Sequence, residues 1–193
     1  MKKYLVILLM FAAISANAQW VQSNGPGGNN IYSLYKNGSY MYAGTFSDGI
    51  MVSTNDGITW KFANSGLSNL EIMAFTVTGS NIFVGTKGGV FVSTNNGDNW
   101  VLRNSGITNL NIWSLASSGN IVYAGTYGNG IFMSTNYGVN WVSINNGSNI
   151  YNVYSIIISG TTIYLGTSPT TGIFVSTNSG SSWTFGMGVD SAH

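Results

Sequence analysis

Hydrophobic residues in this chain come in short runs, and glycine, asparagine and serine separate one run from the next. Such runs are too short for helices, and glycine recurs too often to suit a helix interior. Aromatic and β-branched residues that alternate with small polar ones predict short β-strands joined by tight turns. One run returns four times with the same arrangement, at residues 31–34, 72–75, 112–115 and 153–156.

These runs belong to a longer internal repeat. A tryptophan closes each copy, and successive closing tryptophans lie 40, 41 and 42 residues apart. They are Trp60, Trp100, Trp141 and Trp183. A Gly-Thr pair keeps the same period, beginning at Gly44, Gly85, Gly125 and Gly166. Two independent markers with one period predict four copies of one structural unit.

Each unit contains four predicted strands. The recurring run is the first, the second ends near the Gly-Thr pair, the third follows a glycine-rich turn, and the fourth begins at the tryptophan. Four strands in roughly 40 residues are typical of a β-propeller blade. We therefore predict an all-β fold, a β-propeller of four-stranded antiparallel blades. The blades are expected over residues 30–63, 71–103, 111–144 and 152–186.

The same turn, Ser-Thr-Asn-x-Gly-x-x-Trp, precedes every closing tryptophan. An asparagine side chain can bond the backbone two residues on, and a glycine takes positive φ without steric cost. The serine hydroxyl can bond the same loop, and the tryptophan offers a large apolar surface for packing between blades. Four identical copies predict a structural staple rather than a sugar or ion site. They begin at Ser53, Ser93, Ser134 and Ser176.

These turns resemble the Asp-box, or bacterial neuraminidase repeat, whose pattern is Ser-x-Asp-x-Gly-x-Thr-Trp. The resemblance extends from Trp20 to about Trp183. The repeat is known in propellers of sialidases, xyloglucan-degrading hydrolases, sortilin-type receptors and photosystem stability factors. It implies a propeller fold here but no particular activity. This chain has asparagine where the family has aspartate, at Asn55, Asn95, Asn136 and Asn178.

The N-terminus has the features of an export signal. Lys2 and Lys3 precede an apolar stretch over residues 4–14, which is too short to span the roughly 30 Å hydrocarbon core as a helix. Residues 16–18 form a small-x-small cleavage pattern, so we predict a signal peptide over residues 1–18. Residues 19–193 are then a single repeat domain, secreted or at the cell surface, with no membrane insertion after cleavage.

The strand count predicts an incomplete ring. Residues 20–23 have the pattern of a fourth strand with no blade before it, while the fourth repeat already contains its own fourth strand. Three explanations are open: a fragment of a longer protein, which we favour, a homodimer in which two chains form a larger ring, or a four-blade ring with an idle strand.

Composition excludes several partners and chemistries. Six basic residues less Lys2 and Lys3 leave four, against five acidic residues, for a net charge of −1. Such a surface suits neither nucleic acid nor an acidic membrane. The chain has no cysteine, so disulfides, thiol nucleophiles and thiolate metal sites are excluded. The one histidine, His193, supports neither a metal site nor a Ser-His-acid arrangement. We therefore assign no metal, cofactor or catalytic residue.

Sialidases and other glycosidases each need particular charged side chains. The resemblance implies that a sialidase would hold its substrate carboxylate with three arginines, and this chain has only Arg103. Other glycosidases need two carboxylates that face each other across the scissile bond. Asp48, in a turn between the second and third strands, and Glu71, at the start of a first strand, are the two that a propeller would place on one rim.

The turns between second and third strands vary while the scaffold around them stays constant, as recognition loops on a rigid frame do. Phe46 and Tyr127 in these turns can stack on a sugar ring or a peptide. The predicted binding residues of the rim are Phe46, Asp48, Glu71, Lys87, Tyr127 and Asn129.

Two functions follow from this reading. The first is a secreted, non-catalytic propeller that acts as a binding or scaffold module for a glycan or an extracellular protein. The alternative is the N-terminal portion of an Asp-box glycoside hydrolase. A purely structural surface module is a third reading, and it would neither bind nor turn over a ligand.

Overall fold

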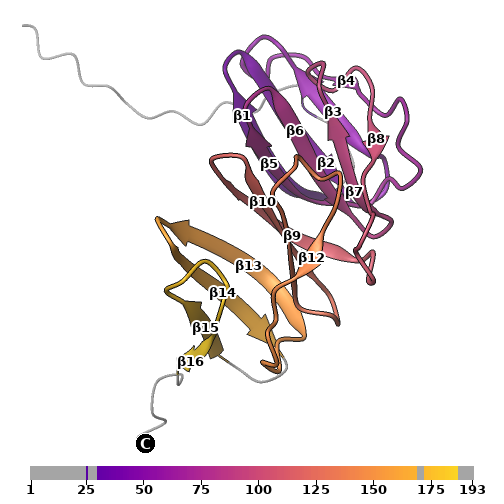
Figure 1. The fold of residues 1–193 in the computed structure, drawn as a ribbon. Helices are drawn as coiled ribbons and strands as arrows, with labels where there is room; N and C mark the ends of the chain where they lie inside the picture. Colours follow the sequence, from indigo (N-terminus) through magenta and orange to yellow (C-terminus); the bar gives the residue numbers. More distant parts are fainter. Residues whose placement is uncertain (1–24, 26–29, 169–171, 187–193) are drawn as a thin grey trace, which may run out of the picture.

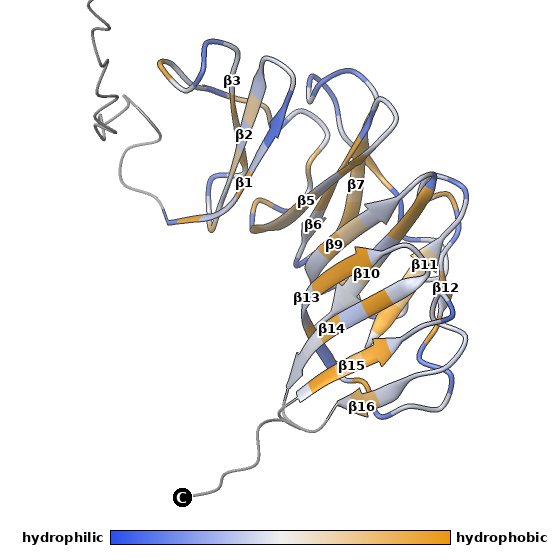
Figure 2. Ribbon diagram, turned by 90° about the vertical axis from the view of Figure 1, so that its left-hand side faces the viewer, coloured by the Kyte–Doolittle hydropathy of each residue, from blue (hydrophilic) through white to orange (hydrophobic). Residues whose placement is uncertain are grey.

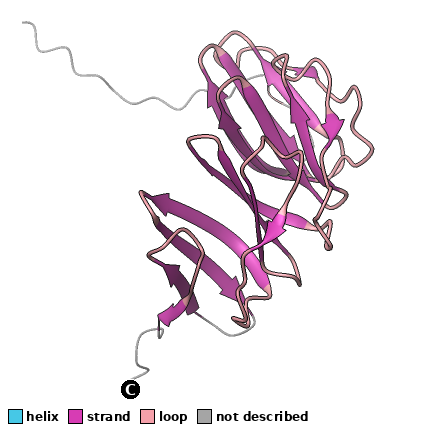
Figure 3. Cartoon of the chain, viewed as in Figure 1, coloured by secondary structure: helices cyan, strands magenta, loops and turns pink. Residues whose placement is uncertain are grey.

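A computed structural model describes residue 25, residues 30–168 and residues 172–186 of the chain. Within these residues the regular structure is entirely β-strand, as Figure 3 shows. The strands form four four-stranded antiparallel sheets, which confirms the predicted fold class. The predicted signal peptide and the extra strand at 20–23 lie outside the described residues.

Each sheet is a meander of four consecutive strands, so spatial order follows chain order. The first blade consists of β1 (Ile31–Asn37), β2 (Tyr40–Thr45), β3 (Ile50–Ser53) and β4 (Lys61–Phe62). The second consists of β5 (Ile72–Thr78), β6 (Asn81–Thr86), β7 (Gly89–Ser93) and β8 (Val101–Leu102). The third consists of β9 (Ile112–Ser118), β10 (Ile121–Thr126), β11 (Ile131–Ser134) and β12 (Val142–Ser143). The fourth consists of β13 (Asn152–Ser159), β14 (Thr162–Ser168), β15 (Gly172–Ser176) and β16 (Thr184–Gly186).

The blades follow one another in space as they do in sequence, from the indigo blade to the yellow one in Figure 1. The first strands of successive blades lie side by side, β1 against β5, β5 against β9 and β9 against β13. These strands are therefore the inner edges of the blades, nearest the axis about which the blades turn. The ring is not closed, as the incomplete ring predicted from the strand count requires.

The fourth strands are shorter than the sequence suggests, and each begins one residue after its tryptophan. In the second and third blades the tryptophan backbone bonds outside its own sheet. The Trp100 amide donates to the Ser65 carbonyl of the first blade (2.9 Å), and the Trp141 amide donates to Ser105 of the second (2.8 Å). Because these amides bond to the preceding blade, they are withdrawn from the ladder of their own sheet.

The hydrophobic core is divided into three clusters, each between two consecutive blades. Between the first two blades, Tyr42 and Ile50 pack against Ile72, Phe91 and Trp100. Figure 2 shows the apolar colour concentrated on the strands rather than on the loops between them. Each fully buried side chain of this size contributes about 1.5–3 kcal/mol. A blade is therefore stabilised mainly by its neighbours, as in other repeat architectures.

The closing tryptophans join one blade to the next, as the sequence predicts. The indole N–H of Trp100 donates to the Ala63 carbonyl at 2.8 Å, and the other two bonds of this kind have the same register. They run from Trp141 to Arg103 (2.9 Å) and from Trp183 to Ile144 (2.6 Å). Trp60 differs, because its indole donates to the Gly57 carbonyl within its own turn.

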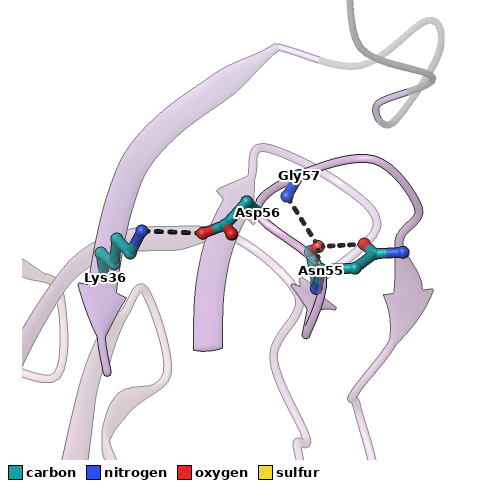
Figure 4. A network of polar contacts seen from close by, with 5 residues as sticks. Lys36, Asn55, Asp56 and Gly57 are labelled. Carbon is teal, nitrogen blue, oxygen red and sulfur yellow. Dashed lines mark hydrogen bonds and ion pairs between the residues drawn. The ribbon is translucent and has the colours of Figure 1, made fainter. Parts of the chain in front are cut away.

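The stapling turns are organised by the serine hydroxyl. Figure 4 shows the first of them, in which Ser53 Oγ accepts hydrogen bonds from the amides of Asn55 (3.3 Å) and Gly57 (2.9 Å). The same hydroxyl donates to Asn55 Oδ1 (2.9 Å). The asparagine side chain differs from our expectation, because Asn55 Oδ1 accepts from the Thr59 amide four residues on rather than two. It therefore closes a wider loop than an Asx-turn.

Two successive residues of each turn have positive φ. The glycine is one of them, as predicted, and the residue before it is the other, at Asp56, Asn96, Tyr137 and Ser179. Asp56 also forms an ion pair with Lys36 of β1 at 2.8 Å (Figure 4). The hydrogen bond and the charge of Lys36 lower the pKa of Asp56. This carboxylate thus belongs to the structural turn.

Candidate functional site

The loops between second and third strands are held by asparagines that follow the fourth strands. Asn64 Oδ1 accepts from the Ile50 amide (2.8 Å), and Asn64 Nδ2 donates to the Asp48 carbonyl (2.7 Å). Asn104 and Asn145 form the same two bonds in the second and third blades. The rim is therefore a set of loops fixed to a rigid frame, which favours recognition by a preformed surface.

A first aromatic cluster stands where the rim of the first blade meets that of the second. Tyr32 and Phe46 stack with their ring centroids 5.4 Å apart. The ammonium of Lys87 lies 5.1 Å from the centroid of Phe46, within range of a cation–π interaction. The same ammonium is 2.5 Å from Glu71 Oε2. The structure thus brings three predicted residues, Phe46, Glu71 and Lys87, into one group.

Asp48 lies on the same rim, beside Glu71. The Gly49 amide donates to the Leu70 carbonyl at 3.0 Å, which joins the Asp48 loop to the segment that leads into Glu71. Ser47 Oγ contacts Asp48 Oδ1 at 3.3 Å. The two carboxylates therefore share one side of the molecule as expected, and Glu71 is engaged with Lys87 there.

A second aromatic cluster lies where the third blade meets the fourth. Trp113 stacks on Tyr127 with centroids 5.4 Å apart, and Tyr154 meets Trp113 edge to face at 5.1 Å. Asn111 Oδ1 accepts from the Trp113 indole (2.9 Å) and fixes the orientation of that ring. Asn109 Nδ2 donates to the Tyr127 carbonyl (2.9 Å). Such offset and T-shaped pairs are favoured aromatic geometries.

Asn129 borders this second cluster from the loop that carries Tyr127. Its side-chain amide donates to Thr108 Oγ1, and its backbone amide donates to Thr126 Oγ1 (3.1 Å). These two bonds tie Asn129 to the end of β10 and to the segment that precedes β9.

A hollow of about 320 Å³ runs along the inner strands below the two clusters. Trp113 and Tyr154 of the second cluster form part of its wall, together with the serines of three inner strands. Those serines are Ser33, Ser114 and Ser155. The Ser33 hydroxyl is buried without a hydrogen-bond partner among the described residues. The Ser114 hydroxyl is buried too and donates to the Val153 carbonyl (2.9 Å), so the hollow offers mainly the aromatic surface of Trp113 and Tyr154.

The sequence identified the loop residues of the rim and missed its strand residues. Tyr32, Trp113 and Tyr154 occupy the same position of the repeat on the inner strands of their blades. The second blade has Met73 at this position. Tyr32 and Tyr154 are exposed there, so they are not needed for the core. A large aromatic at an exposed strand position was the signal that could have found them. The binding role of all these residues remains a prediction.

The described residues contain no group of three or more histidine, aspartate or glutamate side chains that could hold a metal ion. In the same part of the chain, no helix has the length and apolar character needed to cross a membrane.

Comparison with known proteins shows similarity of structure. No protein-family model and no curated protein matches the sequence. An ancestral GH74 enzyme matches over 92% of this chain and 26% of its own, with a TM-score of 0.73 and 26% identity. The extracellular domain of BT4673 from B. thetaiotaomicron matches over 91% and 24%, with a TM-score of 0.73 and 18% identity. YCF48 from Cyanidioschyzon merolae matches over 84% and 57%, with a TM-score of 0.64 and 14% identity.

These structures are β-propellers, in agreement with the fold described above. This chain spans about a quarter of the length of the first two. The similarity therefore supports the propeller fold, and the Asp-box resemblance rests on the turns themselves.

Proposed function

We propose that this chain is an exported, non-catalytic propeller module that binds a glycan on its rim. The observation that carries the proposal is the cluster of Trp113, Tyr127 and Tyr154 beside the hollow of the inner strands. Export is supported by the signal-peptide pattern at residues 1–18 and by the likeness to an extracellular domain of BT4673.

The chemistry of the cluster suits a sugar. One face of a pyranose ring presents C–H groups, which pack on an aromatic ring by dispersion and by attraction to its negative face. Sugar hydroxyls then need short polar partners around that platform, and Asn109 and Asn111, whose side chains bond to Tyr127 and Trp113, are such groups. With so few charges on the chain, we expect a neutral glycan rather than an acidic one.

A second candidate is part of a glycoside hydrolase. Two observations favour it: the likeness to an ancestral GH74 enzyme, and the position of Asp48 and Glu71 on one rim. The ion pair of Glu71 with Lys87 favours the binding proposal instead, because it gives that carboxylate a partner within the chain. An extracellular protein is the other ligand class that our sequence analysis left open, and it becomes an outcome of the test.

The test is a screen of residues 19–193 against neutral and acidic polysaccharides, followed by titration of any that bind. Replacing Trp113 or Tyr127 with alanine should weaken binding about tenfold or more, since a tenfold loss corresponds to about 1.4 kcal/mol. Tyr137→Asn is the matched control: Tyr137 is an exposed aromatic in a stapling turn, and Asn96 occupies the same position in the second blade. The affinity of the Tyr137→Asn variant should equal that of the unchanged chain.

Three outcomes would count against the proposal. Binding to no polysaccharide would exclude the glycan and leave a protein ligand. Equal loss of affinity in the Tyr137 control would place the site elsewhere. Release of reducing sugar that disappears in Asp48→Asn or Glu71→Gln would favour the hydrolase.

A further inference from the structure

The last blade exposes an apolar face. The corresponding faces of the other three blades are buried. One position in each second strand points toward the following blade and contributes to the cluster there. In the first three blades this position is Tyr42, Phe83 and Tyr123, each at most 3% exposed. In the fourth blade it is Tyr164, which is 41% exposed. Tyr164 therefore has the residue type of a blade contact but no blade beside it.

The third strands repeat the observation. Ile50, Val90 and Ile131 are fully buried against the next blade, whereas their equivalent Ile173 is 52% exposed. Ile157, which pairs with Tyr164 across the sheet, is 65% exposed on the same face. An apolar strand surface of this kind is a template for association. This surface, which we name the trailing face, has the composition of a blade interface.

The first blade shows the complementary feature on its opposite side. One repeat position at the start of each inner strand packs toward the preceding blade, and it is buried in Ile72, Ile112 and Val153. Its equivalent Ile31 is 39% exposed. The indole of Trp60 also differs, because it bonds within its own turn where the other three bond to a preceding blade. We name this side the leading face.

We propose that a second copy of this chain covers these surfaces, with the trailing face of each copy docked on the leading face of its partner. The two faces match because the chain already joins such faces three times. Propellers contain about four to eight blades. A ring closed by two copies would have eight blades, which lies within that range. The two contacts are then identical and close on themselves.

The internal interfaces fix the register of the docking. The three carbonyls that accept from tryptophan indoles lie three residues beyond the tryptophan of their own blade. The equivalent in the fourth blade is Gly186, so Trp60 should donate to the Gly186 carbonyl of the second copy. Likewise the Tyr42 hydroxyl donates to the Asn96 carbonyl (3.2 Å), so the Tyr164 hydroxyl should meet the Asp56 carbonyl of the second copy.

Inner strands offer a direct test by disulfide cross-linking, because the chain has no cysteine of its own. Thr76 Oγ1 and Ser117 Oγ lie 2.9 Å apart across the interface of the second and third blades. The equivalents across the proposed contact are Ile157 of the fourth blade and Lys36 of the first. After mild oxidation, the double variant Ile157→Cys, Lys36→Cys should run as a covalent dimer.

Three controls make the cross-link specific. The pair Thr76→Cys, Ser117→Cys should close within one chain and remain a covalent monomer. Each single variant, Ile157→Cys or Lys36→Cys, should form no covalent dimer under oxidation. A disulfide dimer of either single variant would mean that like faces meet, and it would overturn the head-to-tail docking.

Mass in solution completes the test. Residues 19–193 should sediment as a dimer, and Ile173→Asp should shift the mass to that of a monomer while the circular dichroism spectrum is kept. Val142→Asp is the matched control and should remain dimeric, because Val142 is 55% exposed although its blade is covered on both sides. A monomer at every concentration would overturn the proposal. Further blades would then be the structure that covers the trailing face. A series of masses above the dimer would overturn the closed ring.

Discussion

At the scale of single residues, one serine hydroxyl organises each stapling turn. In the third turn, Ser134 Oγ accepts from the amides of Asn136 and Gly138 and donates to Asn136 Oδ1. The asparagine oxygen then accepts from the Asn140 amide (2.9 Å). The bonds that the backbone and the serine of each turn make to this side chain use the oxygen, which asparagine and aspartate share. In the first and fourth turns the asparagine also donates through Nδ2, to Thr59 and Ser182. The replacement of the Asp-box aspartate by asparagine is therefore compatible with the turn.

Ser134→Ala tests this role. The substitution removes the acceptor of two backbone amides, one of which belongs to the buried Gly138, so the free energy of unfolding should fall by about 1–3 kcal/mol. Thr135→Ala is the neighbouring control, and since Thr135 is exposed it should change stability by less than about 0.5 kcal/mol. Urea denaturation of the two variants measures the difference. Equal stability of both would show that the hydroxyl is not what holds the turn.

At the scale of elements, the contact between the first two blades combines an apolar core with a titratable group. Tyr42 of β2 is fully buried against the second blade, and its hydroxyl donates to the Asn96 carbonyl. Burial, with smaller contributions from Tyr40 and Asp98, raises the pKa of Tyr42 to about 12. The neutral phenol is therefore favoured in the folded state.

Alkaline unfolding should report this contact. An unfolded tyrosine has a pKa of about 10, so the stabilisation from Tyr42 is complete below about pH 10 and is lost as the pH rises through about 12. One pH unit above the unfolded pKa, the loss should be about 1 kcal/mol. Tyr42→Phe removes the titration, and the equivalent Phe83 shows that phenylalanine fits this position.

Urea midpoints near pH 9 and pH 11 measure the effect. The variant should lose less stability than the unchanged chain between the two values. It should still lose some, because burial also raises the pKa of Tyr123 at the next interface. If both proteins lost stability equally, the Tyr42 hydroxyl would not be the titrating group.

Strand existence was predictable because the repeat displays each strand four times, with the same turn residues between copies. The residues at which strands begin and end were not predictable, since they depend on contacts between blades. The sequence could not show that the amides of Trp100 and Trp141 bond to the preceding blade. The asparagines that hold the rim loops, Asn64, Asn104 and Asn145, were missed for the same reason, because their partners lie some 14 to 16 residues back along the chain.

The candidate site divides in the same way. Loop residues such as Phe46 and Tyr127 were identified because they vary within a constant frame. Trp113 and Tyr154 lie within predicted first strands and were not singled out, since alternation alone does not say which face of an inner strand is covered. Only the arrangement of the blades shows that this position opens onto the rim and the hollow.

At the scale of the whole molecule, the described chain is a row of blades in which each contacts only its neighbours. The second and third blades are covered on both faces, while the fourth is covered on one. In such a row the stability of a unit is its own contribution plus one term for each interface. The first blade is likewise covered on one face, so local opening should be easier in the first and fourth blades than in the two between them, and in the fourth it involves the face of Tyr164 and Ile173.

Hydrogen exchange can separate this intrinsic gradient from assembly. At low protein concentration, amides of β14 and β15 should exchange faster than their equivalents in β10 and β11, because one interface term is missing. As concentration rises and a second copy covers the trailing face, the β14 and β15 amides should slow while those of β10 and β11 change little. Ile173→Asp should keep the fast exchange at all concentrations. Concentration-independent exchange in the unchanged chain would mean that the trailing face stays open, so that the fourth blade is stabilised by its single interface alone.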